Sequence, residues 1–126
     1  EYARDYAKQR YQFGRPIARY RAIADMLAEM ARELDAARLM CWHAAWMADE
    51  RIPNAKEASM SKAYAAQVAM KVCNNAVQIL GGHGCLRDHP VEKWFRDIKV
   101  FDIFEGTGQA QRIVISRRIL QHLPRE

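Results

Sequence analysis

Residues 18–50 read ARYRAIADMLAEMARELDAARLMCWHAAWMADE and decide the fold class. Apolar residues recur every three or four positions, as on one face of an α-helix: Ile23, Leu27, Met30, Leu34, Ala37 and Cys41. No glycine or proline interrupts the stretch, which would span on the order of 48 Å at about 1.5 Å per residue. A helix of this length in a chain of 126 residues predicts a bundle of long helices.

Further helices are predicted on both sides of this stretch. Residues 55–80 repeat apolar and small side chains at helical spacing, and the same periodicity runs through 90–103 and 107–120. A shorter helical piece is expected before residue 14. We therefore predict an all-α, up-and-down four-helix bundle of long helices, packed roughly antiparallel. It forms a single domain over residues 1–126, and nothing in the sequence favours strands.

Two polar residues are predicted to cap these helices. Asn54, with Glu57 three positions later, has the pattern of a capping box, and Thr107 can cap the last helix. Near the end of the long helix, Trp42 and Trp46 are expected in the core or at a helix interface, because aromatic side chains at this spacing are more typical of packing than of a cofactor site.

The composition excludes several classes of protein. Half of the residues are hydrophobic, and the net charge of +5 comes from basic residues scattered among acidic ones, so nucleic-acid binding is not expected. No apolar run approaches the roughly 18 residues of a membrane span, and no signal peptide is visible. The three cysteines have no metal-binding spacing, which favours a reduced compartment over secretion.

A candidate catalytic carboxylate lies in the stretch from Phe104 to Gln109, FEGTGQ. Glu105 stands between an apolar segment and Gly106, and a carboxylate with apolar neighbours and little water suits a general base working near neutrality. The alternative is an acidic residue at a helix N-terminus, where the helix dipole favours negative charge. From this stretch alone both interpretations remain open.

Two other breaks between helices carry candidate binding groups. Before the first break, a cation, an amide and a ring stand at Arg10, Gln12 and Phe13. The glycine-rich break at 81–84 allows close backbone approach by a ligand, but it also suits an ordinary helix C-cap. His83 and His89 lie in this second region with no third ligand evident, so no metal site is expected.

Four motifs together carry a resemblance to a known family. They are QRYQFGRPI at 9–17, QILGGHG at 78–84, PVEKWFRDIKV at 90–100 and FEGTGQAQRIVISR at 104–117. In order and spacing they resemble the C-terminal helical domain of the acyl-CoA dehydrogenases over essentially the whole chain. Subunits of that family also have an N-terminal helical domain and a middle β-domain, so the resemblance implies a fragment of a longer enzyme that is inactive in isolation.

The resemblance implies α,β-desaturation of an acyl-CoA thioester, with an α-proton passing to a carboxylate base and a hydride to FAD. Glu105 falls on the position of that base in most members. Glu105 and Gly106 fall on the segment that meets the substrate, where the Glu105 backbone N–H hydrogen-bonds the thioester carbonyl. Two departures stand out: Cys85 replaces a frequent aromatic residue, and Gly108 replaces a common Ser or Ala.

The resemblance also implies which residues bind FAD and which partners are expected. The matching positions are Arg10, Gln12, Phe13, Gln78, Gly81, Gly82, Thr107 and Gln109, several of them reaching the FAD of a neighbouring subunit. Family members are usually homodimers or homotetramers that pass electrons to an electron-transfer flavoprotein. The location implied is the cytoplasm for a bacterial protein and the mitochondrial matrix for a eukaryotic one. The alternatives are a non-catalytic oligomerisation bundle and an acyl-CoA oxidase.

Overall fold

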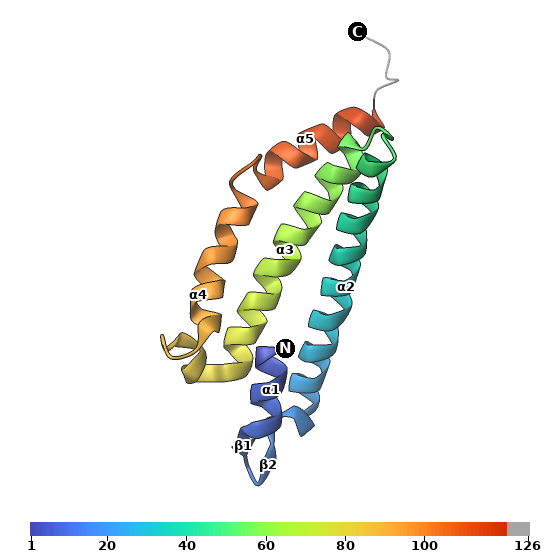
Figure 1. Ribbon diagram of the computed structural model, residues 1–126. Coiled ribbons are helices and arrows are strands. Elements are labelled where there is room, and N and C mark those ends of the chain that lie inside the picture. The colour runs from blue at the N-terminus through green and yellow to red at the C-terminus, as the bar shows by residue number, and fades with distance from the viewer. Residues whose placement is uncertain (121–126) are drawn as a thin grey trace.

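The computed structural model describes residues 1–120, and this part of the chain is helical apart from one short hairpin. The α-helices are α1 (Tyr2–Gln9), α2 (Arg21–Asp49), α3 (Ala55–Leu80), α4 (Pro90–Asp97) and α5 (Gly108–Ile119). Short 3-10 helices are η1 (Ile17–Arg19), η2 (Gly81–Cys85) and η3 (Ile98–Asp102). The prediction of an all-α, up-and-down bundle is confirmed: α2 and α3 run antiparallel along the molecule, and α4 and α5 lie along the other side of α3 (Figure 1).

The core lies where α1 meets the last turns of α3 and the start of α4. Its buried members are small or aliphatic: Ala3, Ala7, Ile17, Met30, Ala76, Ile79, Leu80 and Val91. The alanines allow α1 to approach α3 closely, because small side chains keep helix axes near each other. This packing fixes the end of α3 and the glycine-rich η2 against α1. The candidate functional site lies in this region.

The helical piece expected before residue 14 is confirmed as α1, but it ends earlier than expected. Helix α1 ends at Gln9, and the chain then forms an antiparallel hairpin from β1 (Tyr11–Gln12) and β2 (Arg15–Pro16). The two residues between the strands, Phe13 and Gly14, have φ of 50° and 78°. Two consecutive positive φ angles are typical of the tight turn that joins antiparallel strands. The expectation of no strand was therefore wrong at this one place.

Two further details differ from the sequence-based predictions. The helix expected over 90–103 stays α-helical only to Asp97 and tightens into η3. Asn54 makes no cap bond to α3; its side-chain amide instead donates to the carbonyl of Ala44, 2.7 Å away, and ties the α2–α3 connection to α2. The predicted cap at Thr107 is confirmed, because its hydroxyl accepts from the backbone N–H of Ala110 at 3.2 Å.

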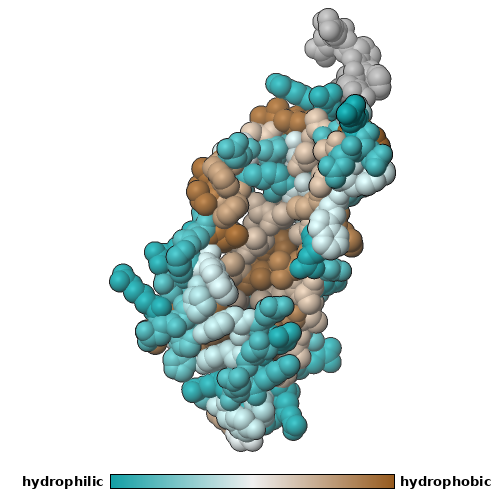
Figure 2. Space-filling model, in the orientation of Figure 1, coloured by the Kyte–Doolittle hydropathy of each residue, from teal (hydrophilic) through white to brown (hydrophobic). Residues whose placement is uncertain are grey.

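A large part of the apolar side-chain surface is exposed in this chain. Figure 2 shows an apolar hollow along the middle of the face where α3 lies between α4 and α2. Trp42 and Trp46 are 62% and 53% exposed, so they do not belong to this chain's core, and the other expected location, a helix interface, stays a prediction. His43 stacks on Trp46, with ring centroids 6.1 Å apart. Within residues 1–120, no helix is both long and apolar enough to cross a membrane.

Candidate functional site

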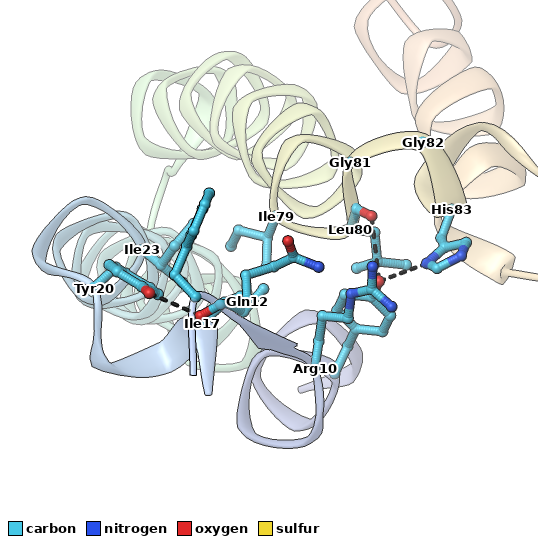
Figure 3. A pocket seen from close by; sticks show the side chains of 12 residues that line it. Arg10, Gln12, Ile17, Tyr20, Ile23, Ile79, Leu80, Gly81, Gly82 and His83 are labelled. Carbon is cyan, nitrogen blue, oxygen red and sulfur yellow. Dashed lines mark hydrogen bonds between the residues drawn. The ribbon is translucent and has the colours of Figure 1, made fainter. Parts of the chain in front are cut away.

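A pocket of about 570 Å³ opens between α1, the hairpin and the junction of α3 with η2 (Figure 3). Its floor is apolar and comes from η1, α2 and α3: Ile17, Tyr20, Ile23, Ile79 and Leu80. Its polar rim comes from the hairpin and from η2. Two segments that are far apart in the sequence, residues 6–23 and 79–83, therefore meet around one hollow, because α1 packs on the end of α3.

The structure brings most of the predicted cofactor residues that precede α4 together in this pocket. Its rim includes Arg10, Gln12 and Phe13 from the hairpin region and Gly81 and Gly82 from η2. These two groups are about 70 positions apart in the sequence. Apart from the family resemblance, nothing in the sequence predicted that they lie around the same pocket. The remaining candidate before α4 lies one turn before Gly81 on α3 and is exposed outside the pocket: Gln78.

Two tyrosines hold the walls of the pocket in place. The hydroxyl of Tyr6 on α1 lies 2.6 Å from Nδ1 of His83 and 3.5 Å from the carbonyl oxygen of Leu80. On the other side, the Tyr20 hydroxyl donates to the carbonyl of Gln12 at 2.8 Å. The Arg15 guanidinium lies over the Tyr20 ring, 4.1 Å from its centroid. Both the hairpin and η2 are thus fixed by side chains that themselves line the pocket.

The pocket rim suits an anionic group that approaches the backbone closely. Among residues 1–120, the Arg10 guanidinium has no ion-pair partner, and it lies at the end of the pocket beside Leu80 and His83 (Figure 3). A Cβ added at Gly81 or Gly82 would meet no atom within 4 Å, so both backbones face open space. Gly81 also has a φ of 59°, which a residue with a side chain would rarely adopt.

Glu105 lies in a separate cluster at the junction between η3 and α5. Its φ of 53° is unusual for a residue that is not glycine, and the next residue, Gly106, has a φ of 92°. The side-chain amide of Gln111 donates to the carbonyls of Glu105 and Gly106, at 3.3 Å and 3.1 Å. Left-handed backbone at such a residue is strained, and strain of this kind is concentrated at functional sites.

The side-chain carboxylate and the backbone N–H of Glu105 are both accessible in this chain. Its side chain is exposed, and within the part of the chain that the structure describes its backbone N–H donates to no carbonyl or side chain. The sequence predicted a carboxylate with limited water, and this single chain does not enclose it. Its neighbour Phe104 lines a mostly apolar hollow of about 250 Å³, whose other lining residues are Lys62, Ala65, Ala66, Ala69, Ile98 and Phe101.

The two other candidates in this region lie on the first turn of α5. Thr107 caps the helix, and Gln109 is exposed two residues later. Below them, the Lys99 ammonium, 2.7 Å from the Asp102 carboxylate, holds the pKa of Asp102 below its ordinary value. A Cβ at Gly108 would lie 2.8 Å from an oxygen of that carboxylate and 3.1 Å from the Arg112 guanidinium, so a larger residue here would require these side chains to shift.

The two clusters are separated along α3. Lys62, on the second turn of that helix, donates to the carbonyl of Phe101 and lies 5.7 Å from the Phe104 ring. Leu80, eighteen positions later, lines the other pocket. At about 1.5 Å per residue, these points are about 27 Å apart. One chain therefore places its predicted catalytic residue and its arginine pocket at opposite ends of the same helix.

Sequence reasoning missed three residues that shape the arginine pocket. Tyr6 was assigned no role, and His83 was considered only as a possible metal ligand. Tyr20 was not singled out at all. The available signal was local: Tyr2 and Tyr6 have the i, i+4 spacing of one helix face, and His83 interrupts a run of glycines. Nothing in the sequence showed that this face meets that run.

Comparison with known proteins gives consistent matches over nearly the whole chain. The family model described as "Acyl-CoA dehydrogenase, C-terminal domain" matches residues 1–120. An acyl-CoA dehydrogenase of Bacillus subtilis is 49% identical over 120 residues, which cover 95% of this chain and 32% of that protein. The CarC subunit of the caffeyl-CoA reductase-Etf complex of Acetobacterium woodii is 47% identical over 116 residues, which cover 92% of this chain and 31% of that protein.

The fold has a close counterpart among solved structures. The chain matches butyryl-CoA dehydrogenase from Megasphaera elsdenii with a TM-score of 0.93 and 39% sequence identity, covering 94% of this chain and 31% of that one. This chain thus spans about a third of the length of the relatives it matches.

Proposed function

Because this chain belongs to the acyl-CoA dehydrogenase C-terminal domain family, we propose that it is the C-terminal helical part of an FAD-dependent acyl-CoA dehydrogenase of fatty acid metabolism. The whole enzyme removes two hydrogens from the α and β carbons of an acyl-CoA thioester. The observation that carries this proposal is the gathering of Arg10, Gly81 and Gly82 around one open pocket, with Glu105 on a strained turn elsewhere. A plain oligomerisation bundle needs neither feature.

The arginine pocket fits one part of FAD, its diphosphate. Arg10 is a cation with no partner among residues 1–120, and arginine binds phosphate oxygens well through charge-assisted hydrogen bonds. The open backbones of Gly81 and Gly82 let a ligand approach without a side chain in the way. Gln12 and Phe13 extend from the hairpin along the same rim, where an amide and a ring can contact the rest of the cofactor.

Glu105 is the base in this proposal. Its carboxylate takes the α-proton, while its backbone N–H, which has no acceptor among residues 1–120, donates to the thioester carbonyl and stabilises the negative charge that develops there. Gly106 keeps the backbone beside this carbonyl free of a side chain. FAD, when bound, accepts the hydride from the β-carbon. Thr107 and Gln109 contribute cofactor contacts from the first turn of α5.

The separation of the two clusters supports an assembly in which subunits share cofactors. With Arg10 and Glu105 at opposite ends of α3, the arginine pocket of one subunit serves the FAD that faces Glu105 of a neighbouring subunit. Gln78, exposed one turn before Gly81, then contacts that same cofactor from outside the pocket. We propose a homodimer or homotetramer, and an isolated chain of this length that has no activity.

The electron acceptor and location follow from the family. We propose that the reduced flavin passes its electrons to an electron-transfer flavoprotein, as the name of the Acetobacterium woodii relative suggests for its own complex. The location is the cytoplasm in a bacterium or the mitochondrial matrix in a eukaryote.

The test uses the full-length enzyme with Glu105→Gln and Arg10→Ala. Glutamine keeps the shape of Glu105 but cannot take the proton, so bleaching of flavin absorbance by an acyl-CoA slows by about 10²–10⁴-fold, with flavin content unchanged. Arg10→Ala does the reverse: flavin is lost while the base is intact. A Glu50→Gln variant, at an exposed acidic residue after α2, is the matched control.

A wild-type bleaching rate in Glu105→Gln across a panel of acyl-CoAs would assign the base to another carboxylate. Full flavin retention in Arg10→Ala would remove the arginine pocket from the proposal. The two results are independent, so each half of the assignment stands or falls separately.

A further inference from the structure

His83 lines the same pocket as Arg10, at the same end (Figure 3), and its imidazole is half-buried. We propose that His83 is a second, proton-dependent cation of this pocket, which joins Arg10 in binding the diphosphate of FAD when its ring is protonated. The inference rests on the proposed function, in which the pocket holds this cofactor, and it adds a residue to which the family resemblance assigned no role.

The hydrogen bonds of Tyr6 allow His83 to take up a proton without disrupting the pocket wall. The Tyr6 hydroxyl has two acceptors in reach, Nδ1 of His83 at 2.6 Å and the carbonyl of Leu80 at 3.5 Å. With a neutral ring, the hydroxyl donates to Nδ1 through the shorter bond. With a protonated ring, Nδ1 donates to the Tyr6 oxygen and the hydroxyl proton turns toward Leu80. Both states keep Tyr6 bonded to η2.

The titratable groups closest to His83 do not neutralise an added positive charge. Tyr6 faces it from α1, and Arg10 shares its end of the pocket. His89 faces it from the loop before α4, with ring centroids 5.7 Å apart, and Nδ1 of His89 lies 2.7 Å from the Tyr2 hydroxyl. These neighbours are neutral or cationic. An anion that enters the pocket is therefore the counter-charge for both Arg10 and His83.

The charged groups of the other adjoining elements are already paired or exposed. Residues 72–80, the last turns of α3, carry no charged side chain. Helix α4 contributes two ion pairs within itself, Glu92 with Arg96 and Lys93 with Asp97. The loop residues Arg87 and Asp88 are exposed to solvent. Within residues 1–120, no carboxylate forms an ion pair with His83 or Arg10.

The proposal predicts how FAD affinity depends on pH. Histidine is the side chain whose charge ordinarily changes between about pH 5 and 8. The diphosphate of FAD is a diester and keeps its negative charge throughout this range. Lowering the pH therefore adds a cation on the protein side only, and FAD binds more tightly. One added charge-assisted hydrogen bond corresponds to a change in the dissociation constant of roughly tenfold or more.

The experiment titrates the full-length apoprotein with FAD from pH 5.5 to 8.5 and follows flavin fluorescence. Wild type is expected to bind FAD roughly tenfold more tightly at the acid end. His83→Gln is expected to bind weakly and without this pH dependence, because glutamine takes up no proton. His83→Lys keeps a positive charge, so it is expected to bind tightly at every pH. Both variants are compared with wild type by circular dichroism.

Two histidine controls make the assignment specific. His43→Gln changes an exposed imidazole on α2, and His89→Gln changes the neighbour that does not line the pocket; both are expected to keep the wild-type pH dependence. The same dependence in His83→Gln as in wild type overturns the inference, as does its loss in His89→Gln alone. If Arg10→Ala binds FAD as wild type does at every pH, the pocket is not the diphosphate site, and this inference fails together with the cofactor half of the proposed function, whereas the assignment of Glu105 is unaffected.

Discussion

The side-chain amide of Gln111 donates hydrogen bonds to the backbone carbonyl of Glu105, at 3.3 Å, and to that of Gly106, at 3.1 Å. Gln111 lies on the first turns of α5, whose N-terminus is capped by Thr107. Through this one side chain, helix α5 stabilises the left-handed backbone at Glu105 and Gly106, in the turn that precedes it. Without these bonds, a backbone conformation that costs of order 1–3 kcal/mol would have less to offset it.

The first prediction concerns this contact. Gln111→Leu removes both hydrogen bonds and lets the Glu105 backbone relax, which displaces the proposed base. Displacements of about 1 Å can lower a rate by about 10²-fold, so we expect slower flavin bleaching by an acyl-CoA with normal flavin content in the full-length enzyme. Gln67→Leu, at an exposed glutamine on α3, is the control. An unchanged bleaching rate in Gln111→Leu would show that the turn holds its shape without this side chain.

The second prediction is that alanine substitution at two glycines of η2, Gly84 and Gly82, has different effects on stability. A Cβ at Gly84 would lie 2.6 Å from the carbonyl oxygen of Val77 and 2.9 Å from its Cα. Both atoms belong to the backbone of α3, which cannot shift without disturbing the packing of that helix. Gly84→Ala is therefore expected to lower the free energy of unfolding by about 1–3 kcal/mol. At Gly82 a Cβ meets nothing within 4 Å, so Gly82→Ala leaves stability within about 0.5 kcal/mol.

Chemical denaturation of both variants measures this difference, and FAD titration adds a second readout. Gly82→Ala is expected to bind FAD more weakly, because its methyl group would occupy the open space beside the pocket. Equal loss of stability in the two variants would contradict the packing seen at Gly84.

The third prediction concerns the cap of α5. Thr107→Ala removes the acceptor for the Ala110 N–H, and loss of such a cap typically costs about 1 kcal/mol. Thr107→Ser keeps a hydroxyl and is expected to retain most of the stability. Denaturant unfolding compares the two. If both variants unfold like wild type, the start of α5 is held by contacts other than this cap.

The sequence predicted the helices well because their signal is local. The spacing in 18–50 and 55–80 needs no knowledge of the partner surface, and Thr107 could be identified as a cap from its own neighbourhood. The hairpin at Tyr11–Pro16 was missed because its turn depends on two positive φ angles, at Phe13 and Gly14. Of these two residues, only the glycine is a type that often adopts a positive φ.

The site was only partly predictable for a different reason. Arg10, Gln12, Gly81 and Gly82 were identified through the family resemblance, and their meeting depends on how α1 packs on α3. The role that we propose for His83 could not be predicted from the sequence, since it depends on a 2.6 Å approach to Tyr6 across 77 positions of sequence. The exposure of Trp42 was missed for the converse reason: helical spacing shows that a face is apolar, and it does not show what covers that face.

The last prediction concerns self-association through the C-terminal helices. Helix α5 and the residue after it expose four large aliphatic side chains: Ile113, Val114, Ile119 and Leu120. An apolar patch exposed on a soluble protein marks an interaction site, and four exposed aliphatic side chains at the end of one short helix predict such a site here. We expect Ile113→Asp with Ile119→Asp to shift the full-length protein toward smaller species in sedimentation velocity, because each buried carboxylate would be left without a partner.

The matched control places the same acidic change on a solvated face. Ala28→Asp lies on the exposed side of α2, between the ion pairs Arg21–Asp25 and Glu29–Arg32, and is expected to leave the mass unchanged. Trp42→Ser tests the competing surface on α2, which is 62% exposed at that residue. If the α5 variant keeps the wild-type mass while Trp42→Ser dissociates the protein, association runs through α2. In that outcome the exposed face of α5 is left for another part of the enzyme to cover.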